Sequence, residues 1–246
     1  MTDISRRKAI KTIGATAAVA AVSAAGIDSM AEKISEHKKT KEMKVLLING
    51  SPRQKGNTNR LLEEIASQLA KNGIGSEIFQ VGGAPVRGCI ECNRCSGLGK
   101  CAFDDDICNR VLEKMAESDA LIVGSPVFYG TPAGQVLSLL QRMAFSGTWA
   151  MENKPAAVLT VCRRGGASAA FQALQMPLQM LNMPIVTSQY WNIAYGLGKE
   201  EVVEDAEGLQ TMRTLADNMA YMLKQFKSGN ADIPVRERGV FTNFTR

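Results

Sequence analysis

From residue 43 to residue 226, short apolar runs alternate with longer segments in which apolar residues recur at helical spacing. Short apolar runs bounded by Gly, Ser or Pro are typical of strands buried on both faces of a parallel sheet. Since parallel strands are joined by crossovers, usually helices, the alternation predicts a three-layer, doubly wound α/β fold. The expected strands are 43–49, 76–81, 120–123, 156–161 and 184–190, and the expected helices are 58–71, 106–118, 131–144, 168–181 and 207–226.

The chain of 246 residues is long enough for one domain of ordinary size, and 45% hydrophobic residues supply a core. Segments on both sides of the alternating region are polar or lysine-rich. We therefore divide the chain into a signal segment at 1–31, a linker at 32–42, an α/β domain at 43–228 with a cysteine-rich loop at 88–108, and a surface tail at 229–246.

Residues 1–31 have the layout of an export signal. Arg6 and Arg7 precede a weakly apolar, alanine-rich run at 12–25. The paired arginines resemble the twin-arginine signal, which exports proteins already folded around a cofactor. An amphipathic N-terminal helix, or a cytoplasmic tail that contains two arginines by chance, is the alternative. We expect an exported protein of the periplasm or cell envelope, with a cytoplasmic location as the alternative.

Charge and histidine content exclude several classes of function. The formal net charge is +5, but residues 1–43 alone carry eight Lys/Arg against five Asp/Glu, and the remaining charges are interspersed. Without a basic stripe that contains aromatic residues, we expect no nucleic-acid partner. The single histidine, His37, precedes the first expected strand, so we expect neither histidine-dependent catalysis nor a histidine metal site. Any chemistry that the protein carries out must therefore come from cofactors or cysteines.

The first chemical motif is Gly-Ser-Pro-Arg-Gln-Lys-Gly-Asn-Thr at 50–58, between the first expected strand and its helix. Backbone N–H groups and the helix dipole favour an anion there. The spacing matches neither the nucleotide-triphosphate loop nor the dinucleotide fingerprint, so a monophosphate fits better. An ordinary loop before a capped helix is the alternative. The candidate phosphate-binding residues are Ser51, Arg53, Gly56, Asn57 and Thr58.

A second Gly-Ser-Pro motif follows the third expected strand, at 124–132. Its two aromatic residues could form a wall for a flat ring, or could simply belong to the core. In the flavodoxin-like strand order 2-1-3-4-5, strands one and three flank the point where ligands bind. Both motifs would then line one crevice, and a phosphate joined to a planar ring is FMN. The candidate ring-binding residues are Pro126, Val127, Phe128, Tyr129 and Gly130.

Together with Tyr-Trp-Asn at 190–192, these motifs resemble the NADPH-dependent FMN reductase family and its iron–sulfur flavoprotein branch. The resemblance extends over about 43–224. It implies a flavodoxin-like fold, bound FMN, NAD(P)H as a possible electron donor, and a homodimer or homotetramer. It also implies that Gly165 and Gly166, after the fourth expected strand, approach the isoalloxazine ring with their backbone N–H groups.

Four of the six cysteines lie within thirteen residues, in the pattern Cys89-x2-Cys92-x2-Cys95-x5-Cys101. Compact Cys-x2-Cys-x2-Cys spacing lets successive thiolates converge on one 4Fe–4S cluster, and the iron–sulfur flavoproteins have a similar compact pattern. Zinc held by four thiolates, disulfides and free thiols are alternatives. The other two cysteines, Cys108 and Cys162, are expected to be buried small hydrophobic residues.

These observations predict an FMN-dependent oxidoreductase that passes electrons from NAD(P)H, or from a quinol or redox protein, to a small acceptor such as a quinone or flavin. The cluster would relay single electrons, and no catalytic acid–base residue is expected. An electron carrier without nicotinamide activity, and a zinc or thiol module on a flavodoxin scaffold, remain as alternatives. Met176, Met180 and Met183 recur near helical spacing and favour an oligomer interface over a purely internal role.

Overall fold

The computed structural model describes residues 42–229 and 232–234. The chain divides between Glu42 and Met43 into two units, and the second carries the whole sheet. The expected signal segment, almost all of the linker and most of the C-terminal tail lie outside the described residues. Within the described part, no helix is both long enough and apolar enough to cross a membrane.

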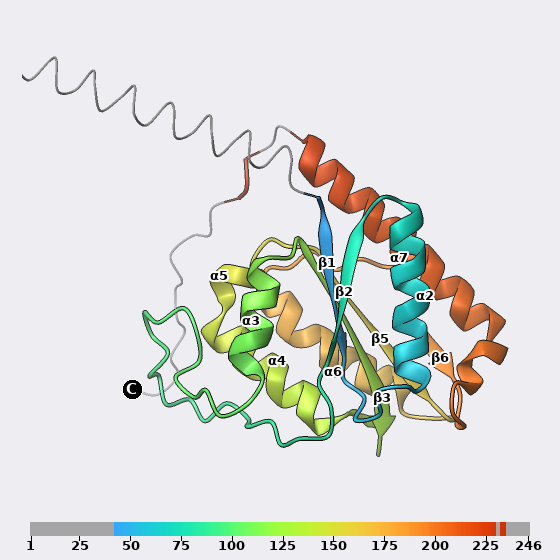
Figure 1. The fold of residues 1–246 in the computed structure, drawn as a ribbon, viewed down its shortest axis with the longest axis horizontal. Coiled ribbons are helices and arrows are strands. Elements are labelled where there is room, and N and C mark those ends of the chain that lie inside the picture. The colour runs from blue at the N-terminus through green and yellow to red at the C-terminus, as the bar shows by residue number, and fades with distance from the viewer. Residues whose placement is uncertain (1–41, 230–231, 235–246) are drawn as a thin grey trace, which may run out of the picture. The chain divides into compact units, whose positions relative to one another are not determined.

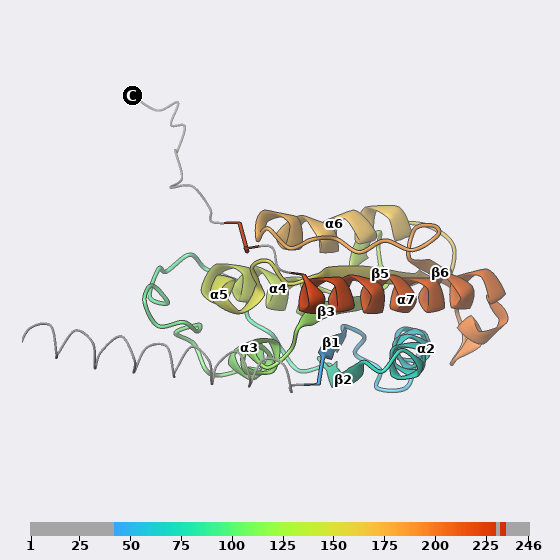
Figure 2. The same ribbon diagram turned by 90° about the horizontal axis from the view of Figure 1, so that it is seen from above.

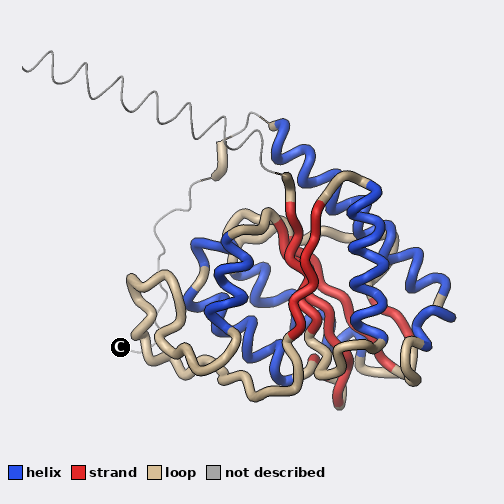
Figure 3. The backbone as a smooth tube through the Cα atoms, in the orientation of Figure 1, coloured by secondary structure: helices blue, strands red, loops and turns tan. Residues whose placement is uncertain are grey.

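The centre of the domain is a parallel sheet with the order β2-β1-β3-β5-β6, shown in red in Figure 3. Its strands are β1 (Lys44–Asn49), β2 (Gly75–Gln80), β3 (Ala120–Phe128), β5 (Ala156–Cys162) and β6 (Ile193–Tyr195). The two-residue strand β4 (Thr131–Pro132) pairs antiparallel with the end of β3. Counted along the chain, the five parallel strands follow the order 2-1-3-4-5, so the predicted flavodoxin-like fold class is confirmed.

Helices cover both faces of this sheet. Alternate residues of β1 face opposite sides: Leu46 and Ile48 join one core cluster, whereas Val45 and Leu47 join the other. The first cluster packs against α3 (Cys108–Ala116), α4 (Gly134–Ser146), α5 (Thr148–Met151) and α6 (Ala167–Met180). The second packs against α2 (Asn57–Lys71) and α7 (Ala206–Ser228), which lie together in Figure 1, and Figure 2 shows α3 and α2 on opposite sides of β1 and β2.

The fifth strand lies later in the chain than predicted. Only Ile185 of the expected strand 184–190 pairs with the sheet, through a bridge to Ala156. The chain then leaves the sheet in a turn where the hydroxyl of Ser188 donates to the carbonyl of Tyr190 at 2.6 Å, and it returns as β6. The Ser188 hydroxyl competes locally with strand pairing, which an apolar run alone does not reveal.

The third strand is longer than predicted, because it continues through the Gly-Ser-Pro motif to Phe128. Its pairing with β1 ends at Gly124, while its pairing with β5 continues to Pro126. Pro126 therefore lies where β3 has a neighbour in the sheet on one side only, a position that tolerates a missing N–H group. This extension carries the second motif beyond the edge of the sheet, into the hairpin with β4.

Candidate functional site

The carboxyl ends of the parallel strands bring the predicted site segments together. The N–H of Gly50, after β1, donates to the carbonyl of Gly124 in β3 at 2.8 Å. A Cβ atom on Gly166, after β5, would lie 2.7 Å from the Cα of Gly130 at the hairpin tip. The two Gly-Ser-Pro motifs and the glycine pair thus lie side by side at the carboxyl edge of the sheet. Ligand sites of doubly wound sheets lie at this edge.

The N-terminus of α2 offers backbone N–H groups to an anion. Gly56 is the N-cap in an extended conformation, no side chain caps the helix, and the first turn contains no acidic residue. The first helical hydrogen bond runs from the N–H of Arg60 to the carbonyl of Gly56, at 3.0 Å. The exposed side chain of Arg53 lies over Gly56, since a Cβ there would be 3.5 Å from that of Arg53. Positive charge and unpaired N–H groups at a helix N-terminus suit a phosphate.

Two of the candidate phosphate residues shape this loop from within. Ser51 is 5% exposed, and its hydroxyl accepts the N–H of Arg53 at 3.1 Å, which holds the turn. Thr58 is 1% exposed, and its methyl carbon would lie 3.0 Å from a Cβ on Gly124. Thr58 therefore packs α2 against β3, and Gly124 leaves room for that packing.

The side chain of Asn57 holds a different loop. Its Nδ2 donates to the carbonyl of Gly198 at 3.0 Å, and its Oδ1 accepts the N–H of Val202 at 3.2 Å. Gly196 approaches so closely that a Cβ there would lie 2.9 Å from the Asn57 amide nitrogen. Residues 196–202 therefore bind both ends of the side-chain amide. Of Asn57, only the backbone N–H is left to bind an anion at the start of α2.

The sequence analysis did not identify the loop at 196–205, which contains the residues that Asn57 holds. The carboxylate of Glu201, in the short 3-10 helix η1 (Glu201–Glu204), accepts the N–H groups of Leu197 and Gly198. These hydrogen bonds lower the pKa of Glu201 below its usual value. Asp205 caps α7 by accepting the N–H of Gly208 at 2.8 Å. An acidic residue just before a helical pattern is a capping signal that could have located this turn.

The aromatic residues of the second motif lie at the surface. Phe128 is 45% exposed and Tyr129 is fully exposed, so the alternative that they belong to the core is wrong. Tyr129 and Gly130 form the tip of the β3–β4 hairpin with φ angles of 51° and 81°. A positive φ is uncommon for a residue other than glycine and is found at functional sites. Tyr190 and Trp191 form a second exposed aromatic pair, with ring centroids 5.1 Å apart.

The glycine pair after β5 begins helix α6. Gly166 is its N-cap, with a φ of 84°, and a Cβ there would also lie 3.3 Å from a methyl carbon of Val127. Gly165 is exposed, and nothing lies within 4 Å of a Cβ built on it. The structure therefore places Gly166 against the hairpin and leaves the backbone of Gly165 open to a ligand.

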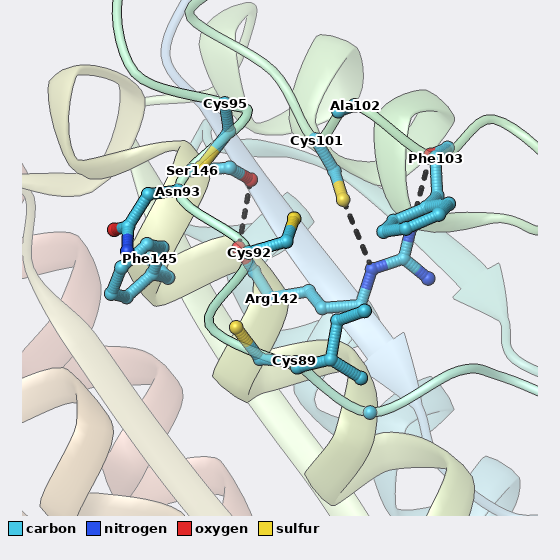
Figure 4. Close-up of a pocket in the computed structure, with 12 residues that line it drawn as sticks. Cys89, Cys92, Asn93, Cys95, Cys101, Ala102, Phe103, Arg142, Phe145 and Ser146 are labelled. Atoms are coloured by element: carbon cyan, nitrogen blue, oxygen red, sulfur yellow. Dashed lines mark hydrogen bonds between the residues drawn. The ribbon is translucent and has the colours of Figure 1, made fainter.

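The cysteine-rich loop runs between β2 and α3, along the lower left edge of Figure 3. Cys89, Cys92, Cys95 and Cys101 line one small cavity together with Arg142 and Phe145 of α4, as Figure 4 shows. All six cysteines are free thiols. Within the described residues, no three Cys, His, Asp or Glu side chains lie close enough to hold a single metal ion. The loop thus gathers four thiols around a hollow without a disulfide.

The pKa values of the cysteines reflect these positions. Burial raises the pKa of Cys95, and the neighbouring thiols of Cys101, Cys92 and Cys89 raise it further. Burial raises the pKa of Cys108 to about 12 and also raises that of Cys162. These two cysteines are 0% and 5% exposed, so their prediction as buried small hydrophobic residues is confirmed.

A buried amide beneath the loop fixes one of the four cysteines. Asn109 of α3 is 5% exposed, and its Oδ1 accepts the N–H of Cys101 at 2.9 Å. Its Nδ2 donates to the carbonyl of Cys101 at 3.1 Å and to the carboxylate of Asp104 at 3.0 Å. Sequence reasoning missed Asn109, because a single Asn in a helical pattern carries no signal of such a role.

Comparisons with known proteins show the family to which this sequence is similar. The model of the NADPH-dependent FMN reductase family matches residues 43–198. An iron–sulfur flavoprotein of Methanocaldococcus jannaschii is 32% identical over 193 residues, which cover 75% of this chain and 100% of the relative. One of Archaeoglobus fulgidus is 33% identical over 200 residues, which cover 76% of this chain and 98% of the relative.

Solved structures share the fold at low sequence identity. RosB with a bound 8-demethyl-8-formylriboflavin-5'-phosphate intermediate aligns with a TM-score of 0.61 and 18% identity, covering 83% of this chain and 94% of RosB. The NADH:FMN oxidoreductase EMOB aligns with a TM-score of 0.54 and 14% identity, covering 73% of this chain and 89% of EMOB. These similarities support the flavodoxin-like architecture described above.

Proposed function

The chain belongs to the NADPH-dependent FMN reductase family of FMN-binding oxidoreductases, and we propose that this member passes electrons through FMN and a 4Fe–4S cluster to a small acceptor. The observation that carries the proposal is the convergence of three segments at one edge of the sheet. The loop before the uncapped N-terminus of α2 is hydrogen-bonded to β3 through Gly50 and Gly124, and the Gly165–Gly166 turn lies directly against the β3–β4 hairpin.

The residues of this edge fit FMN. The first-turn N–H groups of α2, with Arg53 above Gly56, would hold the phosphate. The backbone of Gly165 and the hairpin residues 126–130 would hold the ring, with Tyr129 and Gly130 at the tip. Asn57 would act indirectly, by keeping residues 196–202 beside the phosphate loop. Bound FMN supplies hydride and single-electron chemistry, while the protein supplies binding and orientation.

The phosphate assignment is tested by comparing FMN with riboflavin, which lacks the phosphate. We expect wild-type apoprotein to bind FMN at least about tenfold more tightly, because charge-assisted hydrogen bonds contribute about 1.5–3 kcal/mol. Arg53→Gln should weaken FMN binding and leave riboflavin binding unchanged. Lys71→Gln is the matched control, because it removes the same charge at the opposite end of α2. Equal affinities of the wild-type protein for the two flavins would refute the phosphate site.

Four thiols around one hollow fit an iron–sulfur cluster. Cys89, Cys92, Cys95 and Cys101 would hold it, and the cluster would supply one-electron transfer. Two relatives that match three quarters of this chain are named iron–sulfur flavoproteins, which supports this cofactor over zinc. A cluster is also larger than one ion, so its ligands need not approach as closely as the four thiolates of a zinc site. Metal and sulfide analysis separates the two cofactors.

The electron donor distinguishes a nicotinamide-dependent reductase from an electron carrier. The proposal of NAD(P)H as donor rests on the family, and the sequence contains no nicotinamide-binding motif of its own. Anaerobic mixing of the purified protein with NADH or NADPH should bleach the flavin absorbance within the time of a catalytic turnover. Flavin that stays oxidised with both nucleotides, but is reduced by dithionite, would favour an electron carrier fed by a redox protein or quinol.

Export and oligomerisation are further parts of the proposal. Changing both Arg6 and Arg7 to Lys should retain the protein in the cytoplasm if the twin-arginine segment acts as a signal. Cytoplasmic location of the unchanged protein would instead refute export.

Met176 and Met180 of α6 are 64% and 81% exposed, as an oligomer interface requires, whereas Met183 is only 3% exposed. Light scattering should therefore give the mass of a homodimer or homotetramer.

A further inference from the structure

Arg142 of α4 is buried directly beneath the cysteine-rich loop. It is 2% exposed and is the largest of the fully buried side chains in the described part of the chain. Burial of a charged guanidinium is unfavourable unless its N–H groups and its charge are paired. Its partners therefore show what holds this charge inside the domain.

The guanidinium binds both ends of the loop. Its NH1 group pairs with the carboxylate of Asp106 and donates to the carbonyl of Arg87 at 3.4 Å. Its NH2 group donates to the carbonyl of Phe103 at 3.0 Å. The Asp106 side chain is only 6% exposed, so the ion pair is buried on both sides. These contacts tie α4 to the residues that precede Cys89 and to those that follow Cys101.

The remaining contact reaches a cysteine. The Nε of Arg142 donates to the sulfur of Cys101 at 3.3 Å, the contact drawn as a dashed line in Figure 4. Since Asn109 already holds the backbone of Cys101, this residue is fixed at both its main chain and its side chain.

The ion pair also has a direction. Nε donates to the Cys101 sulfur, while NH1 pairs with the Asp106 carboxylate, so the guanidinium lies between that carboxylate and the thiol of Cys101. A positive charge in a low-dielectric site stabilises added negative charge more strongly than an exposed one. Hydrogen bonds to cluster sulfurs and local charge are known determinants of iron–sulfur reduction potentials.

We propose that Arg142 is a positioning residue that fixes the Cys101 thiolate and that its buried charge raises the reduction potential of the iron–sulfur centre. This inference rests on the proposed function. Reduction by an external one-electron donor adds one electron to the four-thiolate centre, and no bond forms or breaks. The added charge is stabilised by the guanidinium that faces Cys101.

The test compares wild-type protein with Arg142→Gln and Arg142→Lys, all purified anaerobically with iron and sulfide measured per chain. Dithionite titration followed by electron paramagnetic resonance gives the midpoint potential. We expect a more negative potential in Arg142→Gln and recovery of most of that shift in Arg142→Lys. Lys100→Gln is the matched control, because it removes an exposed charge next to Cys101, and its shift should be much smaller.

A second readout needs no cluster. Limited proteolysis of the apoproteins should cut the loop at 88–108 several times faster in Arg142→Gln and Arg142→Lys than in wild type or Lys100→Gln. Circular dichroism and FMN binding show whether Arg142→Gln folds. If it does not fold, the Arg142→Lys variant gives the test. Cutting of its loop at the same rate as in the wild-type protein overturns the positioning role.

The outcomes separate this inference from the proposed function. Iron lost from a folded, FMN-binding Arg142→Gln protein supports the positioning role. If Arg142→Gln contains as much iron as the wild-type protein and has the same midpoint potential, the inference is overturned and the proposed function still stands. Wild-type protein that binds FMN but contains no iron and sulfide overturns the cluster in the proposed function, and the inference with it.

Discussion

Replacement of Gly166 by Ala should damage both stability and FMN binding. Gly166 has a φ of 84°, and an L side chain in the left-handed region costs about 1–2 kcal/mol. The added Cβ would lie 2.7 Å from the Cα of Gly130, which is backbone and cannot rotate away. Overpacking of this kind costs about 1–3 kcal/mol, so we expect a total loss of about 2–5 kcal/mol of unfolding free energy.

The same clash pushes on the proposed flavin site. Relief of the contact requires the tip of the β3–β4 hairpin to move away from α6, which displaces Tyr129 and Gly130. We expect the dissociation constant of FMN to rise by about tenfold or more, equivalent to about 1.4 kcal/mol. Urea unfolding of the apoprotein, followed by circular dichroism, measures the stability, and quenching of flavin fluorescence measures the affinity.

Gly165→Ala is the matched control for stability alone, because the backbone of Gly165 belongs to the proposed ring site. Nothing lies within 4 Å of its added Cβ, and its φ lies outside the left-handed region. A surface change of this kind should alter stability by no more than about 0.5 kcal/mol. If the two variants unfolded at the same urea concentration, and Gly166→Ala bound FMN as tightly as the wild-type protein, the close approach of Gly166 to the hairpin would not be obligatory.

Three further predictions concern other parts of the domain. Asn57→Ala removes two hydrogen bonds to the loop at 196–202 and should lower the unfolding free energy by about 1–2 kcal/mol; unchanged hydrogen exchange in that loop would contradict this role. Glu77 pairs with two lysines, which lower its pKa, so its stabilisation should be present at neutral pH and be lost as the pH falls through that lowered pKa. Glu77→Gln should therefore be less stable than wild type by up to about 1 kcal/mol at pH 7, and a difference that grows in acid would contradict the sign. Cys92→Ser should remove iron and leave FMN bound, whereas Cys162→Ser, at a buried thiol outside the loop, should retain both; iron retained in Cys92→Ser would exclude that cysteine as a ligand.

The strands and helices that carry the core were predictable because local pattern and tertiary burial agree. The run that became β1 is buried on both faces, and its continuous apolar sequence reflects that position. The helical spacing at 58–71 likewise matches the buried face of α2. These elements predicted a doubly wound sheet, and its flavodoxin-like strand order, which the structure confirms, places the two Gly-Ser-Pro motifs at one edge.

Features that depend on a side-chain hydrogen bond within a turn, or on partners distant in sequence, were not predictable. The shift of the fifth strand to Ile193–Tyr195 depends on the turn closed by Ser188. The contacts of Asn57 span 141 and 145 residues, and the contact of Arg142 with Cys101 spans 41. A polar residue within a helical pattern is expected to face solvent, so a buried arginine or asparagine appears only once the elements are packed.

The central claim is that one chain binds FMN at the edge of the sheet and an iron–sulfur cluster in the cysteine-rich loop. The most direct test is anaerobic purification of the full chain, followed by measurement of FMN, iron, zinc and acid-labile sulfide per chain. We predict about one FMN with about four iron and four sulfide atoms. Protein that contains FMN but holds zinc, or lacks acid-labile sulfide, would contradict the account.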